Sequence, residues 1–211
     1  MDHRTTLKSM ILLAIETSVA AASLCLADAE NILFSTTWQA ERNHDAHLFP
    51  ALQKAMNSLP PGASPDYILV GAGPGSYGGV RVALAAGVGI AAVTGAKLVA
   101  VESWAQLAEG NACVVADARR GGWTVRHPDG SIEVLTPEQL AELNAPLYSV
   151  EAPGVVASAQ KEGLSPHAEG LVRTWLNMTT AQQAAAAAKP AEPIYVRPPH
   201  ITKATRKPWE I

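Results

Sequence analysis

Residue types that could bind an anion gather in one stretch near the middle of the chain. The segment Gly71–Arg81 follows a short apolar run, Tyr67–Val70, and its glycines allow positive φ angles and close approach to another group. Where such a loop enters a helix, unpaired backbone N–H groups and the helix dipole both favour negative charge. The loop is therefore a candidate site for a phosphate or another anion, with candidate residues Gly73, Gly75, Ser76 and Gly78.

Other glycine-loop patterns fit this stretch less well. Gly73–Gly78 reads G-x-G-x-x-G, with Glu102 after the next strand, as in a dinucleotide-binding oxidoreductase. Three strand-like runs precede it, however, and Pro74 removes one amide from the turn, so we do not favour that class. No lysine follows the glycines, which excludes a nucleotide-binding P-loop. Proline at position 74 also breaks the G-x-S-x-G pattern of a hydrolase, and we interpret Ser76 as a loop or cap residue.

Outside the loop, few residues suggest catalysis or metal binding. His44 and His47 could share a helix face, but no third or fourth ligand lies nearby, so no metal site is predicted. Glu16 and Asp117 are acidic residues at strand ends, where α/β proteins place catalytic groups, but capping a turn is the commoner role. We therefore assign no catalytic residue.

A stripe of small residues marks the helix after the glycine loop. Gly79, Ala83, Gly87 and Ala91 recur every fourth residue, and no charged residue occurs between positions 82 and 96. Such a helix is buried on more than one side, and a partner helix on the stripe would offset the poor helix propensity of glycine. The alternative is an ordinary core helix under a sheet. The first interpretation gives these candidate partner-interface residues: Leu48, Leu52, Gly79, Val80, Ala83, Leu84 and Gly87.

A regular succession of strands and helices must position these residues. In the first half, strands are expected at 10–15, 20–27, 32–38, 67–70 and 97–101, and helices at 43–57, 79–93 and 102–109. In the second half, strands are expected at 112–116, 123–126, 131–135 and 147–150, with a helix start at Thr136 and a helix end in the alanine run 181–188. This order suggests one strand–helix unit used twice, complete in the first half and trimmed in the second.

The composition excludes several classes of protein. The 211 residues are 48% hydrophobic, enough for a sizeable core, and a net charge of −3 gives no general basic surface for nucleic acid. Cys25 and Cys113 lie far apart in apolar runs, which predicts free buried thiols rather than a disulfide framework. Residues 1–10 lack the layout of a signal peptide, and no apolar run free of glycines is long enough to span a membrane. We therefore expect a cytoplasmic protein without membrane contact.

The C-terminal tail differs from the rest of the chain. Residues 190–211 are rich in proline, which predicts an extended segment, and they include Trp209 and several basic residues. Basic residues next to aromatic ones can bind RNA, and a flexible solubilising tail is the alternative. The candidate contacts to tRNA or a partner are Arg197, Lys203, Arg206 and Lys207.

Several segments, taken in chain order, resemble the TsaB (YeaZ) family. They are Ile15–Ser18, Arg42 with His44, Gly73–Arg81, Asp117–Gly121 and Pro193–Arg197. The likeness runs from about residue 11 to residue 197, and the glycine loop is its most specific part. It implies an α/β, actin-like and ribonuclease H-like fold, shared with sugar kinases and heat-shock ATPases, of two lobes with mixed sheets and a reduced second lobe.

The resemblance also implies a division of the chain and a function. The expected parts are a flexible N-terminus at 1–9, a first lobe at 10–110, a smaller second lobe at 111–189 and an extended basic tail at 190–211. The expected function is that of a non-catalytic scaffold and dimerisation subunit in the bacterial complex that makes N6-threonylcarbamoyladenosine at position 37 of tRNA. Its first-lobe helices would pack on the equivalent helices of a homologous partner.

The same resemblance sets the expected partners and ligands. The partners are a TsaD-like catalytic subunit, a TsaE-like ATPase and tRNA through the complex, with a homodimer when the chain is alone. No cofactor is expected to bind tightly to this chain, and any ATP would lie at the partner interface. Thr17 and Ser18 join the glycine-loop residues as candidate anion-binding or nucleotide-binding residues.

Two positions depart from the family pattern. Glu16 replaces the usual aspartate of the first turn, and Gly78 replaces a threonine of the loop. Glutamate is longer by one methylene, which displaces its oxygens from where an actin-like ATPase holds Mg²⁺, so independent ATP hydrolysis is not expected. The alternatives are an ATPase or phosphotransferase of the same fold that uses the glycine loop, a glycoprotease-like hydrolase, and the dinucleotide-binding oxidoreductase.

Overall fold

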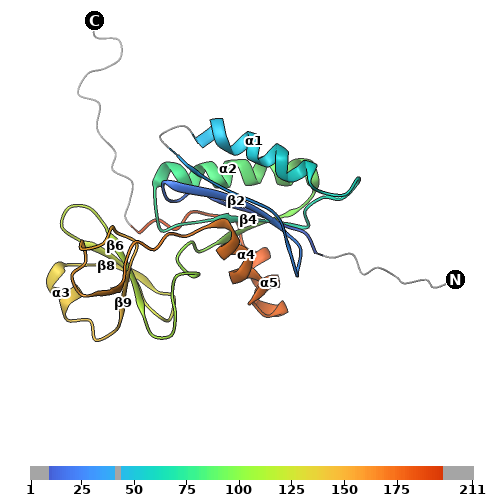
Figure 1. Cartoon of the computed structure of the whole chain (residues 1–211). Helices are drawn as coiled ribbons and strands as arrows, with labels where there is room; N and C mark the ends of the chain where they lie inside the picture. The colour runs from blue at the N-terminus through green and yellow to red at the C-terminus, as the bar shows by residue number, and fades with distance from the viewer. Residues whose placement is uncertain (1–9, 41–43, 197–211) are drawn as a thin grey trace, which may run out of the picture.

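Two five-stranded sheets form the frame of the molecule, one in each of two lobes (Figure 1). The computed structural model describes residues 10–40 and 44–196. The smaller lobe projects to the left in this view, and the larger lobe lies to its right.

The first sheet has the strand order β3-β2-β1-β4-β5. Its strands are β1 (Leu12–Glu16), β2 (Ala21–Ala27), β3 (Ile32–Gln39), β4 (Tyr67–Gly71) and β5 (Lys97–Val101). The first three strands form the antiparallel meander predicted from the sequence, and β4 and β5 follow in parallel to β1. Strand β1 is buried along its whole length, which explains its unbroken apolar run, whereas the edge strand β3 alternates between more and less exposed residues.

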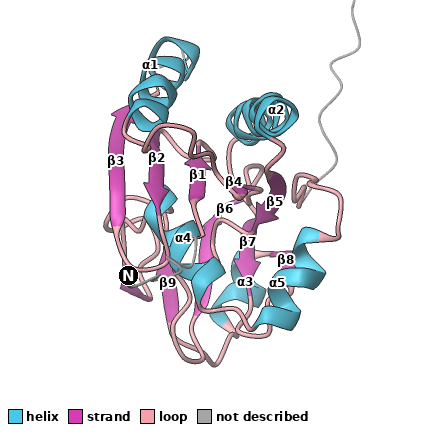
Figure 2. Cartoon of the chain, turned by 90° about the vertical axis from the view of Figure 1, so that its right-hand side faces the viewer, coloured by secondary structure: helices cyan, strands magenta, loops and turns pink. Residues whose placement is uncertain are grey.

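Helices cover both faces of this sheet (Figure 2). On one face lie α1 (His44–Asn57) and α2 (Tyr77–Thr94), and on the other lie α4 (Ala168–Leu176) and α5 (Thr180–Ala187). Strands β4 and β5 are parallel, and the glycine loop and α2 form the helical crossover that connects them. Because antiparallel strands β2 and β3 complete the sheet, it is not the parallel sheet of a dinucleotide-binding domain.

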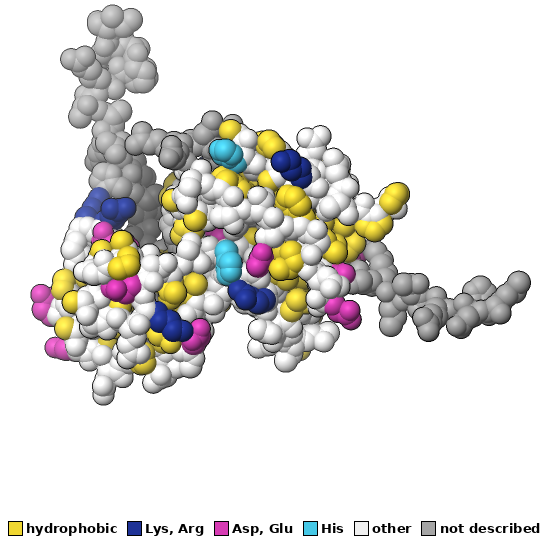
Figure 3. Space-filling view, viewed as in Figure 1, with side chains coloured by type: hydrophobic (Ala, Val, Ile, Leu, Met, Phe, Trp, Pro, Cys, Tyr) yellow, Lys and Arg dark blue, Asp and Glu magenta, His cyan; other side chains and the backbone are white. Residues whose placement is uncertain are grey.

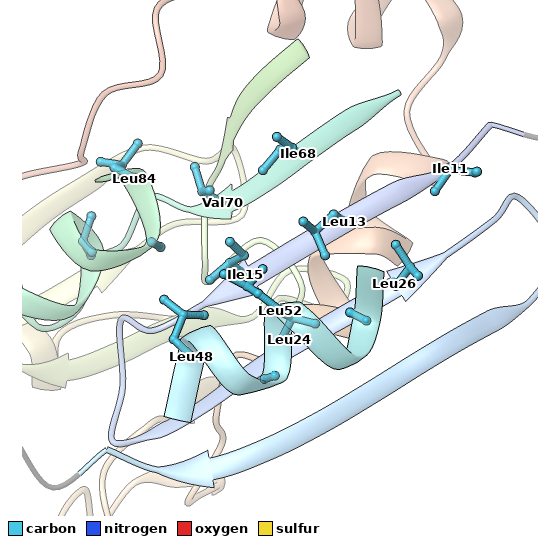
Figure 4. Close-up of a cluster of buried hydrophobic side chains, with 14 residues drawn as sticks. Ile11, Leu13, Ile15, Leu24, Leu26, Leu48, Leu52, Ile68, Val70 and Leu84 are labelled. Atoms are coloured by element: carbon cyan, nitrogen blue, oxygen red, sulfur yellow. The ribbon is translucent and has the colours of Figure 1, made fainter. Parts of the chain in front are cut away.

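The core between the sheet and α1 and α2 contains the residues expected at a partner interface (Figure 4). Leu48 and Leu52 of α1 pack with Leu24 of β2 in one apolar cluster. On α2, the candidate interface residues are buried within the chain, and Ala91, the last residue of the stripe, is partly buried. The buried residues are Gly79, Val80, Ala83, Leu84 and Gly87. The expectation that these seven residues face a partner is therefore wrong.

The small residues of α2 allow this helix to pack closely against its own sheet. A Cβ added at Gly87 would lie 2.7 Å from Leu98 Cδ1 and 2.8 Å from Val70 Cγ1. Glycine therefore lets α2 lie close to β4 and β5. This packing offsets the cost of a glycine in a helix, which is about 1 kcal/mol relative to alanine. The alternative of an ordinary core helix under a sheet is the correct one for this face.

The second core lies on the opposite face and was missed from the sequence. Leu171 and Trp175 of α4 are fully buried against residues of the first sheet, including Leu12 and Leu69. Helices α4 and α5 thus belong to the first lobe, although they follow the second lobe in the sequence. The expected second lobe at 111–189 must be shortened accordingly, because its last helices return to the first sheet.

The second sheet has the order β10-β9-β6-β7-β8. Its strands are β6 (Cys113–Asp117), β7 (Trp123–Arg126), β8 (Ile132–Leu135), β9 (Leu147–Ser149) and β10 (Ala159–Lys161). The predicted hairpin is β7–β8, and the predicted helix start is Thr136, which caps α3 (Pro137–Ala141) in a capping box with Gln139. The reduced second lobe expected from the sequence is confirmed.

One expected helix is absent from the segment 102–109, which forms turns instead. Ser103 explains the difference, because its N–H donates to the Gly73 carbonyl at 2.9 Å and its hydroxyl accepts from the Gly73 N–H at 3.1 Å. The backbone here follows the glycine loop rather than continuing as a helix. Among the described helices, only α2 has the length and hydropathy of a membrane span, and it packs against the sheet along one face.

Candidate functional site

The glycine loop and the turn after β1 form one hydrogen-bonded unit at the carboxyl ends of β1 and β4. The Ser76 N–H donates to the Ser18 carbonyl at 2.6 Å, and the Thr17 hydroxyl donates to the Gly79 carbonyl at 2.7 Å. Ser76 also caps α2, since its Oγ accepts from the Gly79 N–H at 3.3 Å. The role of Ser76 as a cap residue is thus confirmed.

Three glycines are required for this close contact. A Cβ at Gly75 would overlap the Ser18 carbonyl oxygen, and one at Gly79 would overlap the Thr17 carbonyl oxygen. A Cβ at Gly71 would overlap the carboxyl group of Glu16. These glycines therefore bring two backbone segments and a carboxyl group together, rather than leaving space for a ligand between them.

Glu16 is completely buried beneath this unit. Its Oε1 accepts from the Ser18 N–H at 2.7 Å, and among the described residues its Oε2 has no hydrogen-bond partner. Burial raises the pKa of Glu16 above its usual value, and hydrogen bonds from Ser18, Ser103 and the backbone offset part of that rise. The carboxyl group thus turns back onto its own turn, where Oε1 is engaged by the Ser18 N–H.

The structure brings the six candidate anion-binding residues together, but it uses several of their groups internally. The amides of Gly73 and Ser76 donate to Ser103 and Ser18, and both hydroxyl-bearing residues of the turn, Thr17 and Ser18, are buried. Only the outer rim is exposed, from Gly75 to Gly78. At Gly78 a Cβ would meet no atom within 4 Å, so the position of the missing threonine side chain is open space.

A cavity that could hold a nucleotide does not coincide with the loop. A cavity of about 520 Å³ lies at the opposite ends of β4 and β5, where Asp66, Tyr67 and Lys97 contribute to its lining. None of its lining residues belongs to the glycine loop. The loop itself is a junction between two backbone segments, with an exposed rim from Gly75 to Gly78.

Buried polar contacts connect the two lobes. Glu102, just after β5, forms an ion pair with Arg126 of β7 at 2.5 Å, and both side chains are largely buried. Burial raises the pKa of Glu102, and the Arg126 guanidinium offsets part of the rise. The residue that would bind a ribose in a dinucleotide site is therefore engaged in holding the lobes together, which further argues against that class.

In the turn after β6, as in the turn after β1, a carboxylate accepts a hydrogen bond from the backbone amide two residues later. Asp117 Oδ1 accepts from the Arg119 N–H at 2.7 Å, which confirms the turn-capping role expected of this aspartate. Arg119 and Arg120 have φ angles of 63° and 56°, the left-handed region that non-glycine residues rarely adopt. Both are exposed, and their backbone conformation could not be predicted from the residue types.

An exposed aromatic pair at the start of α2 was also missed. The rings of Tyr77 and Tyr195 stack with centroids 5.2 Å apart, and the Arg81 guanidinium lies 5.2 Å from the Tyr77 ring centroid. Tyr195 is held there because the neighbouring Ile194 N–H donates to the Ala72 carbonyl at 2.8 Å. The tail candidates Arg197, Lys203, Arg206 and Lys207 lie outside the described residues.

The outward face of α1 and α2 carries apolar side chains that the stripe hypothesis overlooked. Phe49 of α1 is 61% exposed, and Val88 and Val93 of α2 are 57% and 88% exposed. Among the residues of α2, only Arg81 is charged. The signal was present in the sequence, since a helix that is apolar on all sides has a second apolar face once its first face is packed.

Metal ligands do not gather anywhere in the described part of the chain, since no three His, Cys, Asp or Glu side chains there could hold an ion. Helix α1 begins at His44, and His47 is exposed on its first turn. Cys113 and His127 are a pair of reactive side chains in contact, with the Cys113 sulfur 3.8 Å from His127 Nδ1. The Cys113 thiol is buried, and burial raises its pKa, so it is not an activated nucleophile.

Comparison with known proteins identifies relatives of the chain. The family described as "TsaD: tRNA N6-adenosine threonylcarbamoyltransferase" matches residues 37–145, slightly more than half of the chain. A solved structure from Pseudomonas aeruginosa, described as an uncharacterized protein with similarity to peptidase YEAZ, is 26% identical and has a TM-score of 0.67, with 89% of this chain and 100% of that chain covered. YeaZ from the same organism is 25% identical with a TM-score of 0.66, over 88% of this chain and 99% of that one.

A search of curated proteins found no match. The family match and the two similar structures together confirm the actin-like fold and the resemblance to YeaZ.

Proposed function

Since the chain belongs to the TsaD family of tRNA N6-adenosine threonylcarbamoyltransferases and is similar to YeaZ over most of its length, we propose that it is the non-catalytic subunit of a tRNA-modifying complex. In this proposal it binds and stabilises a TsaD-like catalytic subunit that makes N6-threonylcarbamoyladenosine at position 37 of tRNA. A TsaE-like ATPase and the tRNA join through the complex.

The outward face of α1 and α2 carries this proposal. Phe49 of α1 and Val88 and Val93 of α2 expose large apolar side chains. The two helices lie on the same face of the first sheet (Figure 2). Exposed apolar side chains that form a patch mark sites of protein–protein contact, and in this proposal these three belong to one. A homologous subunit would present a similar pair of helices, so the same face suits both a heterodimer and, when the chain is alone, a homodimer.

The closed glycine loop supports a role without catalysis. Glu16 is buried against its own turn, and the amides of Gly73 and Ser76 donate within the chain. In such a loop, Glu16 Oε1 and the amides of Gly73 and Ser76 are already engaged in hydrogen bonds within the chain. We expect the purified chain to hydrolyse no ATP, and any ATP of the complex to lie at the interface with the catalytic subunit.

The decisive experiment replaces an exposed valine of the proposed interface. Val88→Arg should leave the chain folded, because the side chain points outward, but should abolish homodimer formation and capture of the TsaD-like subunit. An unpaired charge buried in an interface costs several kcal/mol, comparable to the about 8 kcal/mol that hold a micromolar complex. Light scattering measures the assembly state, and circular dichroism measures the fold.

Val155→Arg is the matched control. Val155 is 49% exposed in the second lobe, so the same substitution adds the same charge at an exposed valine away from α1 and α2. This variant should still bind the catalytic subunit. If Val88→Arg also binds it, the interface lies elsewhere on the molecule. ATP turnover that disappears in Glu16→Ala would in turn overturn the non-catalytic assignment.

A further inference from the structure

The stacked tyrosines at the start of α2 resemble a stacking platform rather than a core contact. Tyr77 is 47% exposed and Tyr195 is 45% exposed, so each ring leaves nearly half of its surface to solvent. Their rings are 27° from parallel, with centroids 5.2 Å apart. Two aromatic rings that serve only to anchor a segment would bury more of their area.

A cation accompanies the pair and carries no ion pair with any described residue. Arg81 lies one turn after Tyr77 on α2, and its Nη1 is 3.5 Å from the Tyr77 hydroxyl. No described acidic residue forms an ion pair with Arg81. By contrast, Lys161 lies 4.6 Å from the Tyr148 ring in the second lobe, but it is paired with Glu109 at 2.6 Å.

The space beside the pair is open and electrostatically suited to a phosphate. Gly75, Ser76 and Gly78 are exposed next to Tyr77, and no atom lies within 4 Å of a Cβ position at Gly78. Helix α2 begins here and is 18 residues long, so its positive dipole end faces the same space. The last described segment also reaches this point, where Ile194 binds Ala72 (Figure 1).

We propose that Tyr77, Tyr195 and Arg81 form a contact site for single-stranded or looped RNA, in which an unpaired base stacks on the tyrosine pair and a phosphate binds Arg81. Stacking on aromatic rings with a neighbouring guanidinium is the usual way in which proteins hold unpaired bases. Double-stranded RNA does not offer a free base face, so it is excluded from this site. That the RNA is a tRNA rests on the proposed function.

The mixed surface of the molecule favours such a local site over a broad one. Figure 3 shows acidic and basic side chains interspersed over both lobes on the face in view, without a continuous basic area. The net charge of −3 agrees with this distribution. Affinity for RNA would therefore depend on stacking more than on a general electrostatic field.

The test measures binding of a fluorescently labelled RNA hairpin, with the loop sequence of a tRNA anticodon arm, to the full chain and to its complex with the TsaD-like subunit. Tyr195→Ala should weaken binding roughly 5-fold to 150-fold, the usual effect of losing one base–aromatic stack. Tyr195→Phe keeps the ring and should stay within about twofold of the wild type. Arg81→Ala should reduce the slope of log affinity against log salt concentration by about 1, the amount expected for the loss of one phosphate contact.

Lys161→Ala is the matched control, because it removes a cation from above another tyrosine and should leave RNA binding unchanged. A duplex of the same length should compete poorly. If Tyr195→Ala binds the hairpin like the wild type, or if the wild type binds no hairpin in either form, the proposal is wrong. If Tyr195→Ala keeps RNA binding but loses the catalytic subunit, the pair is a protein contact instead. Capture of that subunit by the wild type tests the proposed function separately.

Discussion

The two lobes have the same sheet topology but differ in what covers the sheets. In each, an antiparallel meander of three strands is followed by two parallel strands, giving the orders β3-β2-β1-β4-β5 and β8-β7-β6-β9-β10. The first lobe inserts helices of 14 and 18 residues where the second has one helix of 5 residues and a loop. The sequence order already suggested one unit used twice.

The comparison shows what the added helices change. In the first lobe, the turn after β1 is covered by the start of α2, and the carboxyl group of Glu16 is completely buried. In the second lobe no helix follows β9, and the side chain of Asp117 in the equivalent turn remains 41% exposed. The same contact, from a carboxylate to the amide two residues later, is therefore internal in one lobe and open to solvent in the other.

The largest effect is expected where α2 meets its own sheet. Ala83→Arg places a cation in a fully buried position between α2 and the first sheet, and an unpaired buried charge costs several kcal/mol. Since whole domains are stable by about 5 to 15 kcal/mol, the variant should unfold or lose most of its stability. Thermal unfolding followed by circular dichroism measures the loss.

Ala85→Arg is the control for this prediction, because Ala85 is exposed on the same helix. It makes the same chemical change on the outward face and should keep the fold. If Ala83→Arg remained folded and only lost its partners, the small residues would belong to an interface after all. The contrast between the two alanines thus separates the inward and outward faces of α2.

Much of the first lobe could be predicted because its local signals agree with its packing. The apolar runs of β1 and β4 and the glycine loop follow from residue type and spacing, as does the cap at Thr136 in the second lobe. The failures have tertiary causes. The segment after Glu102 follows hydrogen bonds to the glycine loop, and α4 packs on a sheet whose strands lie far earlier in the sequence.

The candidate site was predicted in its residues but not in its geometry. The family resemblance grouped Ser18 with the glycine loop. It could not show that Gly75 and Gly79 make room for the backbone of that turn rather than for a ligand. It also could not show that Tyr195, near the end of the described chain, returns to stack on Tyr77. Contacts between segments so distant in sequence leave no periodic pattern.

An intermediate effect is expected from the two equivalent carboxylates. Glu16→Gln removes an ionisable group that burial destabilises in its charged form, and the new amide keeps an oxygen that can accept from the Ser18 N–H. The variant should be more stable than the wild type at pH 8 by about 1 kcal/mol, or roughly 2 to 4 °C in Tm. Asp117→Asn, in the open turn, should change stability by less than about 0.5 kcal/mol.

The pH dependence tests the cause of this effect. Because the pKa of Glu16 is raised in the folded chain above its usual value of 4.5, the folded state binds more protons than the unfolded state above that pH. Stability of the wild type should therefore fall as the pH rises from 4.5 through the folded pKa. The advantage of Glu16→Gln should vanish near pH 4, and an advantage that is equal at pH 4 and pH 8 would mean that ionisation is not its source.

The smallest effect concerns the backbone of the second-lobe turn. Among the described residues, every position with positive φ is a glycine except Arg119 and Arg120. A non-glycine residue in this region costs about 1 to 2 kcal/mol, while glycine loses about 0.5 to 1 kcal/mol in chain entropy. Arg120→Gly should therefore stabilise the chain by up to about 1 kcal/mol.

Arg120→Ala removes the same guanidinium but keeps the Cβ, so the difference in Tm between the two variants isolates the backbone strain. Equal Tm values would show that the turn is unstrained. A third outcome is possible: Arg120→Gly is more stable, but the complexes of Arg120→Gly and Arg120→Ala both modify less tRNA. The strain would then be retained because the guanidinium is needed on this open turn.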